Sequence, residues 1–135
     1  MDVTLLSALI GIAAGAVGYW FVTFSMRPVL RYLEVRSKVF SDFIYYAQVV
    51  NADGLNEEMQ ALYRERVLAN RLSSAQLRAT YLELPTWYKN HLAFKELDPE
   101  GASAALIGFS NTTDHRDSFD IQRRILRKLG LPTET

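Results

Sequence analysis

The chain begins with a long run that has no charged residue. In the positions after it, apolar residues recur with the period of an α-helix. Val3–Met26 spans 24 residues without a charged side chain. About 20 apolar residues are enough to cross a bilayer core of about 30 Å, because an α-helix rises 1.5 Å per residue. The serine and threonine hydroxyls of the run can bond to the helix backbone. The run therefore predicts a single transmembrane helix.

Three other interpretations of this run fit less well. A cleaved signal peptide begins with basic residues, whereas Asp2 precedes this run, although Ala14–Ala16 resembles a small-residue cleavage site. A core helix of a soluble domain is usually shorter and has a polar stripe. A helix that lies flat in the membrane interface needs a charged face. We therefore expect the run to be retained and to span the bilayer.

The residues at the two ends of the run predict its orientation. Asp2 precedes it, while the stretch 27–38 that follows holds four basic residues and one acid. Basic residues beside a membrane helix stay on the cytoplasmic side, and aromatic residues gather at the interface. The expected location is therefore the inner (plasma) membrane, with the N-terminus outside and the C-terminal domain in the cytoplasm. The expected membrane-interface residues are Tyr19, Trp20, Arg27 and Arg31.

Small residues form a stripe along the same run. Ser7, Gly11, Gly15 and Gly18 recur at spacings of four, four and three, which places them on one helix face. Small residues let two helix backbones approach closely, which favours association in lipid. Glycine is also common in membrane helices for other reasons. We interpret these four residues as a helix–helix interface of a homo-oligomer.

The first helix after the membrane begins at Pro28. This proline should push Arg27 away from helical angles, so we expect the chain to kink or to restart there. Val29–Val50 then reads as an amphipathic helix, with Arg36 in the middle of its apolar arc. The other members of the arc are Val29, Leu33, Phe40, Phe43, Ile44, Ala47 and Val50.

A longer helix is predicted from about Asn56 to Leu82 or Glu83, capped by Asp53 or Asn56. Its apolar residues form two stripes, which predicts a helix packed on two sides. The second side meets either another helix of the bundle or a neighbouring subunit. One stripe holds Met59, Leu62, Ser73 and Leu77 together with Arg66, and the other holds Leu68, Leu72, Ala75, Ala79 and Leu82.

Three shorter helices complete the predicted fold. One begins at Pro85, with Trp87 and Leu92 inward; the next begins at Asp98–Glu100 and runs to Phe109. The last ends at Leu129, before a glycine and a proline, with Ile121, Ile125 or Leu126, and Leu129 inward. The expected fold is all-α, with a transmembrane anchor (1–27), a cytoplasmic bundle of four or five helices (28–131) and a C-terminal tail (132–135).

Composition and charge narrow the classes of function. The chain has no cysteine, which excludes disulfides and thiolate metal sites. Its 15 basic and 15 acidic residues give no basic excess, so we expect no nucleic-acid binding. The two histidines, His91 and His115, lack metal-ligand spacing, and no catalytic motif is present. We therefore expect no cofactor, no metal and no enzymatic activity. An enzyme could draw only on Arg36, Arg66, Asn70 and His91.

Two sets of polar residues leave alternatives open. Arg36, Arg66 and Asn70 lie on helix faces that we expect to be buried, and a buried charge needs a partner. That partner could be an acid or a carbonyl of the bundle, an anion or lipid headgroup, or a neighbouring subunit. The basic stretch Arg123–Lys128 is either a solvated face or a contact with anionic lipid.

Arg27–Tyr32 directly after the membrane helix, and Ala105–Asn111 later, resemble segments of small bacterial proteins with one N-terminal membrane helix and a short cytoplasmic helical domain. The resemblance implies a bacterial inner membrane and no particular activity. The expected function is a membrane-anchored oligomeric scaffold or protein-interaction module. The alternatives are an oligomeric pore or membrane-perturbing effector, and a subunit of a larger membrane complex.

Overall fold

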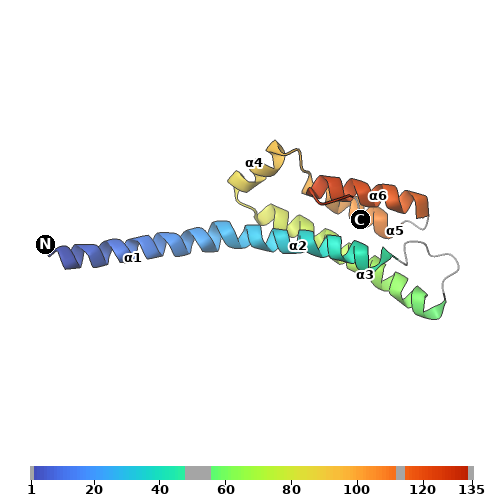
Figure 1. The fold of residues 1–135 in the computed structure, drawn as a ribbon, viewed down its shortest axis with the longest axis horizontal. Coiled ribbons are helices and arrows are strands. Elements are labelled where there is room, and N and C mark those ends of the chain that lie inside the picture. The colour runs from blue at the N-terminus through green and yellow to red at the C-terminus, as the bar shows by residue number, and fades with distance from the viewer. Residues whose placement is uncertain (1, 48–55, 112–114, 134–135) are drawn as a thin grey trace.

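The computed structural model describes residues 2–47, 56–111 and 115–133, and these residues form helices and no strand. Figure 1 shows an apolar N-terminal helix that projects from a helical bundle. The predicted all-α fold, with one apolar N-terminal helix and a helical domain, is confirmed. In chain order the elements are α1 (Val3–Phe21), the π-helical turn η1 (Val22–Met26), α2 (Arg27–Tyr45), α3 (Glu57–Glu83), α4 (Thr86–Phe94), α5 (Pro99–Asn111) and α6 (His115–Leu129).

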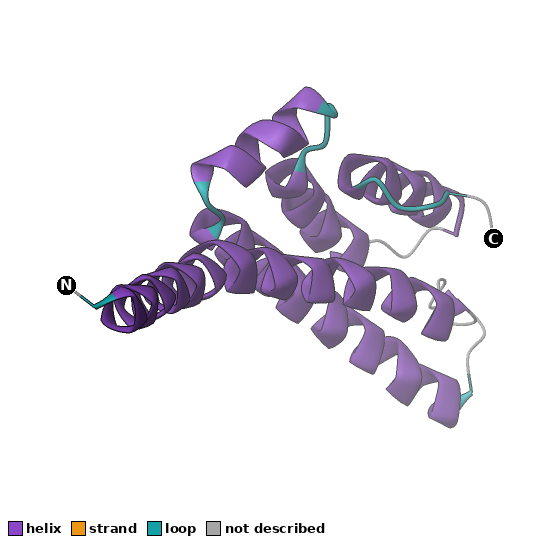
Figure 2. Ribbon diagram, turned by 60° about the vertical axis from the view of Figure 1, so that its left-hand side comes forward, coloured by secondary structure: helices purple, strands orange, loops and turns teal. Residues whose placement is uncertain are grey.

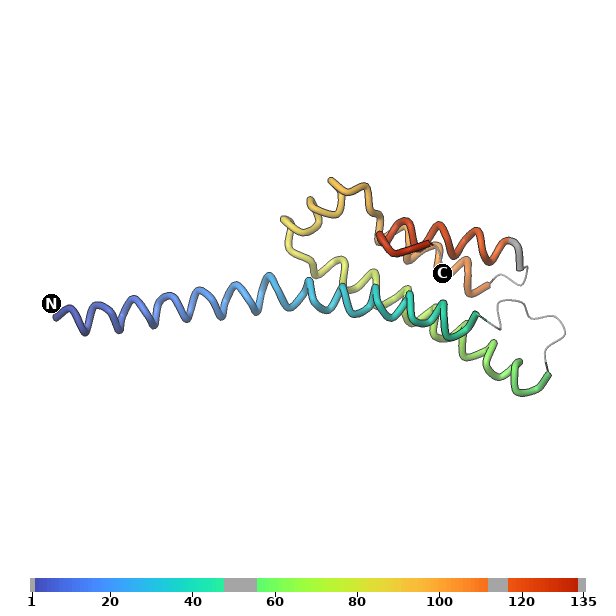
Figure 3. The backbone as a smooth tube through the Cα atoms, in the orientation of Figure 1, coloured from blue at the N-terminus to red at the C-terminus, as the bar shows by residue number. Residues whose placement is uncertain are grey.

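The first three elements join into one helix from Val3 to Tyr45, which the tube in Figure 3 follows without a break. Pro28 lies in the first turn of α2, as expected for a restart, but Arg27 keeps helical angles (φ −60°, ψ −45°), so that prediction was wrong. The reason is the π turn: the Arg27 N–H donates to the Val22 carbonyl, which places an extra residue in the turn before the proline ring. The wider turn accommodates the ring without ending the helix.

The bundle has two layers, with α2 and α3 side by side and α5 and α6 against them (Figure 2). The most extensive helix pair is α3 with α5, followed by α3 with α2 and α5 with α6. The short helix α4 lies at the end of the bundle nearest α1 (Figure 1).

The buried face of α2 differs from the predicted arc. Val29 and Phe43 are buried as expected, whereas Ile44 is exposed. Tyr32 and Val39 are buried in their place, because α2 contacts both α3 and α6 and its inward face is turned accordingly. Burial raises the pKa of the Tyr32 phenol. Ala47 is exposed, and Val50 lies outside the described residues.

The later helix signals are confirmed at their ends. The Asn56 side chain accepts a hydrogen bond from the Met59 N–H (2.8 Å) and caps α3. Asp98 accepts from the Gly101 N–H (3.0 Å) at the start of α5. At the end of α6, Gly130 has φ +71°, and the following Leu131 N–H bonds back to the Leu126 carbonyl (2.9 Å). This pairing is the glycine-dependent helix stop that the sequence indicates.

One inward prediction for α4 was wrong. Leu92 is buried as expected, but Trp87 is about half exposed. A helix of three turns or fewer at the end of a bundle can bury only one narrow face, and here Tyr88 and Leu92 occupy it. In α6, Ile125, Leu126 and Leu129 are all buried, while Ile121 packs at the edge of the core.

Candidate functional site

The small-residue stripe of α1 meets nothing within the chain. Ser7, Gly11, Gly15 and Gly18 are all exposed, and an added methyl group at any of the three glycines would meet no other part of the chain within 4 Å beyond its own helix turn. Around Gly18, a shallow apolar groove is lined by Ile10, Ala13, Ala14, Val17 and Phe21. The stripe is therefore open to close approach by another helix.

The predicted membrane-interface residues lie around the junction of α1 and α2. Tyr19, Trp20 and Arg27 are exposed, and the Trp20 ring lies 5.7 Å from the ring of Phe24. Arg31 forms an ion pair with Glu83 (3.2 Å), which joins the start of α2 to the end of α3. The C-terminal end of α3 therefore lies beside the start of α2, next to the end of the apolar helix.

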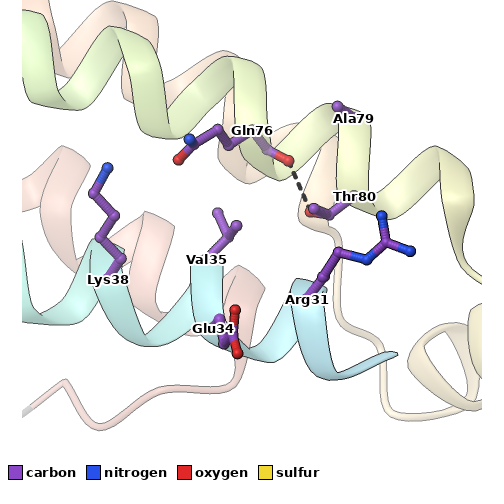
Figure 4. Close-up of a pocket in the computed structure, with 7 residues that line it drawn as sticks. All are labelled: Arg31, Glu34, Val35, Lys38, Gln76, Ala79 and Thr80. Atoms are coloured by element: carbon purple, nitrogen blue, oxygen red, sulfur yellow. Dashed lines mark hydrogen bonds between the residues drawn. The ribbon is translucent and has the colours of Figure 1, made fainter. Parts of the chain in front are cut away.

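A groove between α2 and α3 lies just beyond this ion pair (Figure 4). It has a volume of about 350 Å³ and is open to solvent. The Thr80 hydroxyl donates to the Gln76 carbonyl (2.7 Å), and Arg31 is held by Glu83, so these polar groups bond within the chain. The groove therefore offers no converging set of ligands for a small molecule. Its lining residues are Arg31, Glu34, Val35, Lys38, Gln76, Ala79 and Thr80.

The inner face of α3 holds the predicted buried polar residues. Arg66 is 1% exposed, and its guanidinium lies between the rings of Tyr63 (4.9 Å) and Phe109 (4.6 Å). It also donates to the Phe109 carbonyl (3.5 Å). Burial lowers the pKa of Arg66. Asn70, one turn further along, is equally buried.

Arg36 is half-buried and donates to the carbonyl of Leu129 (3.4 Å) at the end of α6. Of the partners considered for Arg36 and Arg66, the structure shows carbonyls of the bundle. His91 lies on the exposed side of α4, with its ring 5.6 Å from Tyr88. Arg36 contacts the end of α6, Arg66 contacts α5 and His91 lies on the exposed side of α4, so these three do not converge on one reaction centre with Asn70.

The outer face of α3 carries the second predicted stripe. Leu68, Leu72 and Leu82 are 68%, 52% and 59% exposed, and Ala75 and Ala79 between them are exposed as well. The spacings of the stripe are four, three, four and three, the heptad spacing of a helix that packs against a parallel or antiparallel partner helix. We call Leu68, Leu72, Ala75, Ala79 and Leu82 the outer seam. No other helix of the described chain covers it.

The basic stretch at the end of α6 is partly neutralised. Lys128 forms an ion pair with Asp98 (3.2 Å), and Arg124 lines a surface hollow together with Asp117 and Asp120. Arg123 and Arg127 are exposed. These contacts favour the solvated face over a dedicated lipid site.

The described residues contain no group of three His, Cys, Asp or Glu side chains that could hold a metal ion. The side chain of His115 lies outside this description. Comparison with protein-family models, with curated proteins and with solved structures gave no match. The two surfaces of the described chain that are open to a partner are the small-residue stripe of α1 and the outer seam of α3.

Proposed function

We propose that this protein is a membrane-anchored interaction module that associates with further copies of itself. The observation that carries the proposal is the outer seam, a heptad-spaced apolar stripe that the described chain leaves uncovered. A monomeric soluble protein rarely leaves a contiguous apolar patch exposed without a partner for it.

The proposed anchor is the apolar part of the long N-terminal helix. The most apolar window of the long N-terminal helix is 0% buried against the rest of the chain, which is not the position of a core helix. An apolar surface of this length needs an apolar environment from outside the chain, and a bilayer core has the matching thickness. Insertion with the basic residues on the cytoplasmic side gives the orientation that we propose.

A second copy is the partner that fits the outer seam. Copies anchored in one membrane share one orientation, so symmetry about the membrane normal brings two α3 helices together in parallel. In a parallel pair the residues that flank the seam meet across it. Arg78 flanks one side, and Glu83, whose carboxylate also pairs with Arg31 of its own chain, flanks the other. Both are exposed, so parallel pairing brings opposite charges near each other. An antiparallel pair would instead bring Arg71 of one copy near Arg78 of the other, which places like charges together.

The membrane makes such an interface strong enough to matter. The outer seam covers about two heptads, fewer than the three or four that mark a free-standing coiled coil. Confining the copies to one membrane raises their effective concentration, which converts a weak contact into a stable one. The small-residue stripe of α1 provides a second contact between the same copies.

The test is the mass of the particle in nanodiscs, measured by light scattering for the parent chain and two variants. Leu72→Lys places a charge in the seam and is expected to reduce an oligomer to single chains. Ile44→Lys changes an equally exposed aliphatic residue on α2 and is the matched control. A parent chain that is monomeric, or an oligomer that survives Leu72→Lys and falls apart with Ile44→Lys, would overturn the proposal.

A further inference from the structure

The bundle has one end that adjoins the apolar helix, and α4 forms part of that end. The ring of Tyr88 on α4 lies 6.1 Å from the ring of Tyr32, which is in the second turn of α2. From Arg27 to Tyr32 the helix rises about 7.5 Å at 1.5 Å per residue. The headgroup layer is about 5–8 Å thick on each side of the hydrocarbon core. If the core ends near Arg27, α4 lies at the depth of the headgroups.

The face of α4 opposite its buried side is aromatic. Trp87 and Phe94 are separated by seven residues, which places them on one side of the helix, and they are 49% and 87% exposed. Leu92 faces the other way and is buried. A tryptophan side chain that is about half exposed is suited to the boundary between lipid and water, because its ring is apolar and its N–H is polar.

A further exposed apolar side chain lies on the neighbouring helix α2, where Leu30 in its first turn is 53% exposed. The surface at this end of the bundle is therefore apolar on both α2 and α4, around the end of the helix that we propose to span the bilayer.

The charges at this end suit a membrane surface. Residues 27–31 and 82–96 hold four basic and two acidic side chains, and one of the acids, Glu83, is paired with Arg31. The opposite end of the bundle carries acids in the first turns of α3 and α6, namely Glu57, Glu58 and Asp117. Basic residues beside a cytoplasmic leaflet are attracted to anionic lipid, whereas acids are repelled.

We propose that α4 and the start of α2 form a membrane seat, in which Trp87, Phe94 and Leu30 enter the headgroup layer of the bilayer. This inference rests on the proposed insertion of α1, and its partner is the lipid itself. The seat is a second point of attachment after the spanning helix, so it restricts how the bundle can tilt. A bundle held at two points presents the outer seam sideways, along the membrane plane, toward neighbouring copies.

The chain offers a direct test, because Trp20 and Trp87 are its only tryptophans. Trp20→Phe leaves Trp87 as the single reporter in the full-length protein, reconstituted in vesicles of phosphatidylcholine and phosphatidylglycerol. Lipids that carry a quencher near the headgroup are expected to quench Trp87 more than lipids quenched at the bilayer centre. Acrylamide, which quenches from the water, is expected to quench Trp87 less in the vesicles than in the unfolded chain without detergent.

Two matched variants separate this inference from the proposed anchor. Trp87→Phe leaves Trp20 as the reporter of the spanning helix, and it should be quenched by lipid whether or not the seat exists. Tyr45→Trp, in a chain without Trp20 and Trp87, places a reporter on an exposed site at the far end of α2, where only acrylamide should quench. Quenching of Trp20 but not of Trp87 by lipid would overturn the seat and leave the anchor. A lack of lipid quenching for both tryptophans would overturn both.

Discussion

The two faces of α3 reverse the usual distribution of side chains. Its inner face is buried and largely polar, with Arg66, Asn70 and Ser73 almost inaccessible to water. Its outer face is exposed and apolar, with Leu68 and Leu72 open to solvent. In an ordinary surface helix the leucines would be inside and the arginine outside.

The inner face of α3 has its partner within the bundle, whereas a partner for the outer face is what we propose. The inner face packs against α5, where small serines allow close approach: the Ser74 hydroxyl donates to the Ser103 carbonyl at 2.6 Å. Arg66 keeps its charge beside aromatic rings and a carbonyl. The outer leucines remain largely exposed in the described fold, which is why we propose that a second copy covers them.

The largest expected difference in stability comes from removing one leucine from each face. Leu77 is fully buried, and Leu77→Ala should lower the free energy of unfolding by about 2–5 kcal/mol. Leu72→Ala, in detergent that keeps the chain monomeric, should change it by less than about 0.5 kcal/mol. Urea unfolding followed by circular dichroism measures both. Equal losses for the two variants would show that the outer seam is covered within the chain.

The second prediction concerns the charge on the inner face. Within the described residues the salt bridges are Arg31–Glu83 and Lys128–Asp98, and neither involves Arg66. Replacing a buried charge by an apolar side chain of similar volume is often neutral or stabilising. Arg66→Met should therefore change the free energy of unfolding by no more than about 1 kcal/mol.

The control for that variant is Arg66→Lys, which keeps the charge but loses the planar stacking on Tyr63 and Phe109. We expect the lysine variant to be less stable than the methionine variant in the same urea titration. If the lysine variant is the more stable of the two, Arg66 binds a carboxylate or another anion in addition to the Phe109 carbonyl.

The sequence distinguished the two faces of α3 but did not predict several details of how the helices pack. The 3.6-residue period separated the two stripes of α3, and the caps at Asn56 and Asp98 and the stop at Gly130 follow from local chemistry. Such signals lie within a few residues of the element they define, so one sequence is enough to find them.

The predictions that failed depend on contacts between distant segments. The inward residues of α2, Tyr32 and Val39, depend on where α3 and α6 pack, which no local period contains. The π turn before Pro28 is one of several ways to accommodate a proline, and the sequence does not distinguish them. Trp87 looked like a core residue because aromatic side chains usually are, and only the position of α4 shows that it faces outward.

A smaller effect is expected at a site that neither face of α3 touches. Asp98 caps α5 and pairs with Lys128, and the Gly101 N–H and then the Lys128 ammonium hold the pKa of its carboxyl below the usual range. Its stabilising contribution is therefore present above about pH 4 and is lost as the pH falls through the lowered pKa of the folded state. Asp98→Ala should cost about 1 kcal/mol at pH 7, and this cost should become smaller at low pH, where the protonated carboxyl can still cap the helix but no longer pairs with Lys128.

Asp98→Asn is the control, because an amide oxygen can still cap the helix but does not titrate. Both variants should leave the mass of the nanodisc particle unchanged, since Asp98 lies away from the outer seam and from α1. A change in mass with either variant would contradict the assignment of assembly to those two surfaces.

The smallest expected effect on folding is at the stripe of α1. Gly11→Leu and Gly15→Leu add side chains that meet no other part of the chain beyond their own helix turn, so the unfolding of the bundle should not change. In the membrane the same variants block close approach of a second helix, and we expect a weaker assembly. An unaltered assembly would leave the outer seam of α3 as its sole contact.

We propose that the outer seam of α3 meets the same seam of a second copy in parallel. The chain has no cysteine, so a single cysteine placed along α3 is the only thiol, and disulfide formation between copies can be followed in nanodiscs. Parallel pairing predicts fast cross-linking at Leu72→Cys, Ala75→Cys and Ala79→Cys, and slow cross-linking at the flanking Arg71→Cys and Arg78→Cys. Cross-linking that is absent throughout, or that shows no heptad spacing, would contradict the account.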